Sequence, residues 1–147
     1  MTYATRADIE AIYGAGQLET LVAADVDLDE AVARALADAG AQMDPYLRKR
    51  YRLPLPPVAS AMLRACAIDI ACWQLASSID RISEQIEKRF KLRLDFLREL
   101  AAGKIELAEL DEFLITPPGD GTIGSGSDSG AAFSADARRW PAGGGIL

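Results

Sequence analysis

Apolar residues recur every three or four positions at residues 27–43 and 82–102, and they fill most of the stretch between, at residues 58–77. The spacing is the period of an amphipathic helix and the middle stretch has the length of a buried one, so the pattern predicts three long helices. The first has a clear start, because Asp27 followed three residues later by Glu30 is typical of a helix N-terminus. Acidic residues there also favour the positive end of the helix dipole.

The second and third stretches differ in how much of their surface is apolar. Residues 58–77 are apolar on almost every face, and such a helix lies in the middle of a bundle or under a partner subunit. Residues 82–102 carry one wide apolar face. Gly103 follows where a glycine commonly ends a helix, so we expect the third helix to stop there.

Shorter helical pieces are expected on both sides of these stretches. Thr5 with Asp8 resembles a capping box and predicts a helix start, and Gly14 with Gly16 predicts the end of that helix. Two further short amphipathic pieces are expected at about residues 18–22 and 105–114.

Proline residues interrupt the pattern after residue 43. Pro45 within a helix removes one backbone donor and clashes with the carbonyl four residues earlier, at a cost of about 3 kcal/mol. We therefore expect a kink or short break at Asp44, followed by helix through Tyr51. Residues 53–57 are proline-rich and are expected to be extended, with Pro57 as the first position of the next helix.

The character of the chain changes after Thr116. Residues 117–145 hold eight of the twelve glycines, and too little apolar surface is present there to offset the entropy of ordering. We expect an all-α protein, with a small bundle of four main helices and a Pro-rich loop in residues 1–115, and a flexible Gly-rich tail in residues 116–147. The tail ends in aromatic and basic residues, which are either a docking peptide or part of a terminus without a role: Phe133, Arg138, Arg139 and Trp140.

The composition narrows the chemistry. Half of the 147 residues are hydrophobic and 26% are charged, as in an ordinary globular protein. The chain has no histidine, which excludes Ser-His-Asp and Cys-His relays and HExxH metal helices. Cys66 and Cys72 lie six apart, on different faces of one helix, and are expected to be small buried residues in a reducing compartment. We therefore expect no catalysis, no metal and no cofactor.

No targeting or membrane segment is expected. The N-terminal residues lack the apolar region of a signal peptide. The most apolar stretch, at residues 58–76, is interrupted by Arg64 and Asp69, so we expect no membrane span and no membrane partner.

The net charge of −6 is unevenly distributed. Residues 1–44 carry nine acids and two bases, whereas residues 45–52 carry four bases and no acid. Segregated charge of this kind can orient contacts between proteins, although a solvated surface is the alternative explanation. An acidic protein is in general a poor ligand for duplex DNA.

The basic residues form a cluster that has two interpretations: Arg48, Lys49, Arg50 and Arg52. The cluster could hold phosphates while Tyr51 stacks on a base. It could instead complement the negative end of a helix dipole and neighbouring acids, which is the more common role. Two pairs of acidic residues also have two interpretations: Asp27 with Asp29, and Asp111 with Glu112. They could serve metal binding or acid–base chemistry, or they could cap helices, which is the favoured interpretation.

Several segments together resemble a small structural family of Mu-like bacteriophages, over about residues 3–110. The agreement lies in residues 3–10, 43–47, 50–55, 66–71 and 100–104. The most specific part is the run formed by Tyr46, Leu47, Arg50, Tyr51, Leu53, Pro54 and Leu55. Two residues depart from the family pattern: Pro45, where a small residue is more usual, and Phe90, where tyrosine is usual.

Members of this family resemble neck proteins, the adaptor or connector ring between the portal and the tail of a long-tailed phage. The resemblance implies an α-helical virion protein assembled in the bacterial host cytoplasm, in a ring of twelve copies that binds the portal and other neck or tail-completion proteins. Phage DNA would pass through the ring without specific binding. The basic cluster would then meet acids of a neighbouring subunit or of the portal, and residues 131–147 would reach an adjacent neck component.

A second function stays open at this point. A small helical DNA-binding regulator would have the same helices and would use the basic cluster of residues 48–52 to contact phosphates. It would bind duplex DNA with an affinity that falls as salt rises, whereas a connector would bind free duplex weakly.

Overall fold

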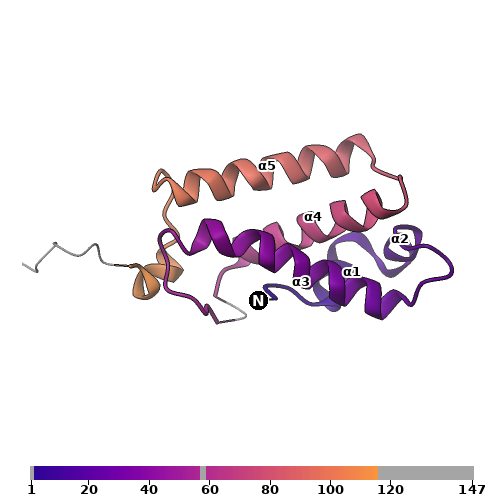
Figure 1. Ribbon diagram of the computed structural model, residues 1–147, viewed down its shortest axis with the longest axis horizontal. Helices are drawn as coiled ribbons and strands as arrows, with labels where there is room; N and C mark the ends of the chain where they lie inside the picture. The colour runs from indigo at the N-terminus through magenta and orange to yellow at the C-terminus, as the bar shows by residue number, and fades with distance from the viewer. Residues whose placement is uncertain (1, 57–58, 116–147) are drawn as a thin grey trace, which may run out of the picture. The chain divides into compact units, whose positions relative to one another are not determined.

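The computed structural model describes residues 2–56 and 59–115 of the chain, and these residues form an all-α bundle, as predicted (Figure 1). Within them, strand-like pairing of the backbone is limited to a single antiparallel β-bridge between Tyr51 and Leu114. The elements are α1 (Arg6–Tyr13), α2 (Ala15–Thr20), α3 (Leu28–Leu47), α4 (Ala61–Ser78), α5 (Glu84–Ala101) and a 3₁₀ helix η1 (Ala108–Phe113).

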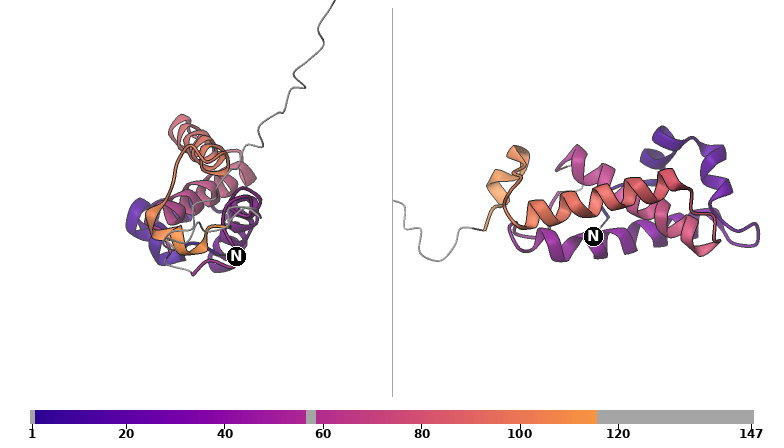
Figure 2. Two further views of the ribbon diagram at one scale, coloured as in Figure 1. Left: turned by 90° about the vertical axis from the view of Figure 1, so that its left-hand side faces the viewer. Right: turned by 90° about the horizontal axis from the view of Figure 1, so that it is seen from above.

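Helix α4 lies in the middle of the bundle. Seen along the long axis, α5, α3 and the α1–α2 pair are arranged around it (Figure 2). Helices α3 and α5 pack along α4 and against each other, and the ring of Trp73 on α4 stacks on Phe90 of α5 at a centroid distance of 4.1 Å. Ten residues of α4 are buried by the chain itself. Of the two positions predicted for this apolar helix, the middle of its own bundle is therefore confirmed.

Side-chain caps define several helix ends at the predicted residues. Thr5 and Asp8 form a capping box at the start of α1, and the Asp27 carboxylate accepts the backbone N–H of Glu30 at 2.9 Å at the start of α3. Gly103 has a φ of 76° immediately after the cap of α5, a conformation that favours glycine. Gly14 ends α1 as predicted, but Gly16 lies inside α2.

Of the kink or short break predicted at Asp44, the break is wrong, because α3 continues through Pro45 to Leu47. Pro45 stands in the last turn of the helix. It cannot donate a hydrogen bond to the carbonyl of Ala41, and both residues are exposed. Water can therefore replace the missing hydrogen bond on the outer side of the helix. Helix also fails to reach Tyr51, since residues 48–50 form a turn.

The predicted start of α4 is also wrong. The helix begins at Ala61, because the Ser60 hydroxyl accepts the backbone N–H groups of Met62 at 3.2 Å and Leu63 at 3.4 Å. The Ser83 hydroxyl likewise caps α5, which begins at Glu84, two residues beyond the expected start. Pro57, expected to open the helix, lies outside the described residues.

The predicted tail lies outside the described residues as well, so its boundary at residue 116 and its flexibility stay predictions. The same holds for its proposed docking residues: Phe133, Arg138, Arg139 and Trp140.

Candidate functional site

A cluster of polar side chains joins three helices inside the bundle. Asp69 on α4 is only 4% exposed, and its carboxylate accepts hydrogen bonds from the Tyr13 hydroxyl at 2.8 Å and from Nε of Arg93 at 2.7 Å. Arg89 donates to the Tyr13 hydroxyl at 2.9 Å, and its guanidinium carbon lies 5.3 Å from the centre of the Tyr13 ring. The cluster therefore ties α1 and α5 to α4.

The environment favours the protonated forms of Tyr13 and Arg89. Burial, together with the hydrogen bond to Asp69, raises the pKa of Tyr13 to about 12. The hydrogen bond to Tyr13 raises the pKa of the Arg89 guanidinium above its usual value. A protonated phenol and a guanidinium exchange no proton near neutral pH, so Tyr13 and Arg89 serve here to hold α1 and α5 together.

A groove lies beside this cluster, between α1 and α5. Its volume is about 380 Å³, and we call it the α1–α5 groove. Two large apolar side chains at this groove are more than half exposed, Ile12 at 55% and Leu92 at 59%. Single exposed apolar residues are common, but two at one groove make it a candidate interaction surface. The lining residues are Ile12, Ala65, Asp69, Arg89, Leu92 and Arg93.

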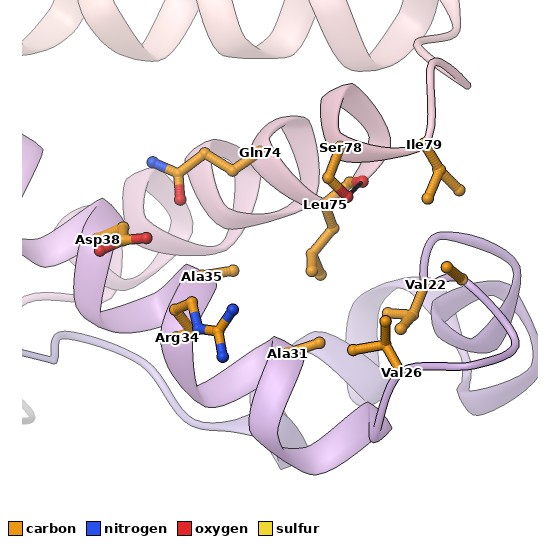
Figure 3. Close-up of a pocket in the computed structure, with 11 residues that line it drawn as sticks. Val22, Val26, Ala31, Arg34, Ala35, Asp38, Gln74, Leu75, Ser78 and Ile79 are labelled. Carbon is orange, nitrogen blue, oxygen red and sulfur yellow. Dashed lines mark hydrogen bonds between the residues drawn. The ribbon is translucent and has the colours of Figure 1, made fainter.

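A second recess, which we call the Val26 pocket, lies between α3, α4 and the loop before α3. Figure 3 shows Val22, Val26 and Leu75 around it, with Arg34 and Asp38 at its edge. Its volume is about 310 Å³, and aliphatic side chains form most of its wall. Val26 is itself 45% exposed, so it contributes to the outer surface as well as to the pocket.

The two recesses open on opposite sides of α4. Asp69 lines the groove and Ser78 lines the pocket. These residues are nine positions apart in one helix, which at about 100° per residue places them about half a turn from each other. One subunit therefore has an apolar recess on each of two opposed faces.

The basic cluster is divided by its contacts. Arg50 forms an ion pair with Glu106 at 3.0 Å, and its guanidinium lies beside Gly103. The backbone also joins these segments, since the N–H of Ile115 donates to the carbonyl of Arg50 at 2.7 Å. Arg48, Lys49 and Arg52 are exposed and form no ion pair within the described part of the chain.

The pairing of Arg50 brings an acidic segment against the basic cluster. Sequence reasoning separated these two charge blocks, because residues 105–115 stand more than fifty positions after residue 50. Arg50 meets an acid of its own chain, so the cations open to a partner are Arg48, Lys49 and Arg52.

One of the two acid pairs has structural roles. Asp27 caps α3, and Asp29 forms an ion pair with Arg6. Asp111 and Glu112 are exposed within η1, whose start has no side-chain cap, so the capping interpretation is wrong for this pair. In residues 2–56 and 59–115, no three Cys, Asp or Glu side chains are grouped so that they could hold a metal ion. No helix in that part of the chain has the length and hydropathy needed to cross a membrane.

Cys66 and Cys72 are buried and unbridged, as their spacing predicted. Burial raises the pKa of each thiol to about 12, so neither is a thiolate nucleophile near neutral pH.

Comparison with known proteins identifies the family of the chain. The family model described as bacteriophage Mu, Gp36, matches residues 3–122. The chain is 34% identical to "Gene product J" of Escherichia phage Mu over 132 residues, which cover 87% of this chain and 92% of that protein. It is 37% identical over 86 residues to the Mu-like prophage FluMu protein gp36 of Haemophilus influenzae, covering 58% of this chain and 59% of that protein. The chain therefore belongs to the Gp36 family of Mu-like bacteriophages.

Proposed function

We propose that the protein is a structural component of a long-tailed phage virion, an adaptor ring in the neck between portal and tail. The observation that carries the proposal is membership of a bacteriophage Mu family across the whole described bundle. The fold is compatible with this role, because its polar cluster braces helices and its two opposed recesses suit contacts between copies.

The distribution of charge supports a subunit that makes different contacts at its two ends. Asp25 and Asp27 lie at the start of α3, whereas Arg48 and Lys49 follow its last residue. Helix α3 has 20 residues and is therefore about 30 Å long. We infer that Arg48, Lys49 and Arg52, the exposed cations at that end, face acids of the portal or of the next neck component, which leaves the sides of the bundle for neighbouring copies in the ring.

Deletion of the gene from the phage that encodes this chain tests the proposal. We expect filled heads and finished tails to accumulate separately, and the purified protein to restore joining when it is added to them. The mass of joined particles then gives the copy number, expected to be twelve. Normal joined particles without the protein would contradict the proposed function.

The same joining assay tests the predicted docking tail. A chain that ends at Thr116 is expected to keep the helical content of the bundle but to restore joining poorly. Joining at the level of the full chain would show that residues 117–147 are not needed for it.

Charge reversal tests the basic end of the subunit. We expect Arg48→Glu combined with Arg52→Glu to reduce joining at least tenfold, because both side chains are exposed and a reversed charge would repel an acidic partner. The fold should be unaffected, since neither residue has an ion pair to lose in the described part of the chain. Arg48→Lys with Arg52→Lys keeps the charge and is the matched control.

The same variants decide between a connector and a DNA-binding regulator. Glu106 neutralises Arg50, and further acids of residues 105–115 lie near the cluster, so we expect weak binding of the native chain to duplex DNA. Tight, salt-sensitive binding that the double Glu variant abolishes would favour the regulator.

A further inference from the structure

The two opposed recesses carry opposite charge. Asp38 lines the Val26 pocket and Asp25 precedes Val26 in the chain; both are exposed and form no ion pair within the described residues. Arg34 is paired with Glu30 at 2.8 Å, and the exposed Arg81 in the adjoining recess is offset by Glu19, which lines the same recess. The pocket face is therefore acidic.

The face with the α1–α5 groove is basic when only the charges without an ion pair are considered. Arg93 is paired with Asp69, which leaves Arg89 without a carboxylate within ion-pair distance among the described residues. Lys88 is exposed, has no ion pair there, and stands one helical turn before Leu92. Leu92 is thus an exposed apolar side chain with two cations next to it.

We propose that the Val26 pocket of one copy binds the Leu92 side of the α1–α5 groove of a second copy of this chain. In this contact Leu92 enters the pocket beside Val26, and Lys88 and Arg89 face Asp38 and Asp25. The inference deepens the proposed function, on which it rests, by naming the surfaces that join neighbouring subunits.

The geometry favours a repeating contact over a symmetric pair. Because the two surfaces differ and lie on opposite sides of α4, each bound copy leaves one of each kind free for the next copy. Such a head-to-tail contact generates a ring when the rotation between copies closes.

A second copy fits the pocket better than a small molecule does. At about 310 Å³ the pocket is at the lower limit of small-molecule sites, which span about 300–1,000 Å³. Its wall is mainly aliphatic, and the exposed apolar side chain on the opposed face supplies the matching group.

Cysteine cross-linking tests the contact in particles. Full-length chain carrying both Val26→Cys and Leu92→Cys is supplied to the phage that lacks the gene, and purified particles are treated with a short bis-maleimide. Both positions are exposed, so the substitutions should not disturb folding. The natural cysteines are buried and protonated, so only the introduced thiols should react.

We expect most of the chain to migrate as a ladder of two and more copies. Each single variant should stay a single band, because a head-to-tail contact never brings two equal positions together. Val26→Cys with Ile115→Cys is the matched control pair, since Ile115 is 43% exposed but does not line the groove, and it should give no ladder.

Three results would overturn the contact. One is a Leu92→Cys homodimer, which indicates a symmetric interface, and another is a cross-link from Val26→Cys to a protein of different mass. The third is joined particles that contain the double variant but give no ladder. That result would overturn the contact and leave the proposed role in the neck unaffected. Particles joined without the protein would instead remove the proposed function and this inference together.

Discussion

Replacement of Asp69 by asparagine is expected to lower the free energy of unfolding by about 3 kcal/mol. The variant keeps the shape of the side chain but leaves Arg93 without its carboxylate, and removing one partner of a buried ion pair costs about 3–5 kcal/mol. The lower limit applies because the Arg93 side chain is 30% exposed and can recruit water. Urea unfolding of the full chain, followed by circular dichroism, measures the difference.

Asp95→Asn is the matched control for this variant. Asp95 pairs with Arg98 at 2.8 Å, but both side chains are more than 60% exposed, so the loss should stay within about 0.5 kcal/mol. A second comparison adds Arg93→Met to Asp69→Asn, which removes the unpaired cation and should recover part of the stability. Equal effects of the Asp69 and Asp95 variants would show that the buried pair does not stabilise the bundle.

Local signals predicted several helix ends, and the errors had both local and nonlocal causes. The predicted start of α4 was wrong for a local reason, since the Ser60 side chain caps the helix. Thr5 with Asp8 and Asp27 with Glu30 were confirmed, because each pair acts within a single turn. The short break expected at Asp44 was wrong. The cost of Pro45 within a helix depends on which side of the helix meets water, and that side is set by tertiary packing.

Less of the candidate site than of the fold could be predicted from the sequence. The sequence showed Asp69 as a charge within an apolar stretch, but its partners Tyr13 and Arg93 come from helices 56 and 24 positions away. The ion pair between Arg50 and Glu106 was hidden for the same reason, being 56 positions apart. Only the folded chain brings these groups together, and with them the groove beside α1 and α5.

Truncation of Ile70 to alanine is expected to destabilise the bundle by about 3 kcal/mol. Ile70 is fully buried on α4, and removing its outer methyl groups loses their burial and leaves a cavity that its neighbours fill only in part. Urea unfolding should show this loss at every protein concentration, because α4 is covered by helices of its own chain. A loss that grows as the protein is diluted would instead indicate that a partner subunit covers α4.

Leu92→Ala separates the stability of one subunit from the joining of several. Leu92 is 59% exposed, so in the free chain this truncation should change the free energy of unfolding by no more than about 0.5 kcal/mol. If Leu92 nevertheless binds the Val26 pocket of a neighbour, the same variant should reduce the yield of joined particles. Ile70→Ala should behave in the opposite way, with a less stable subunit whose contact surfaces are unchanged. Similar loss of stability in both variants would mean that Leu92 is part of the core and not of an assembly surface.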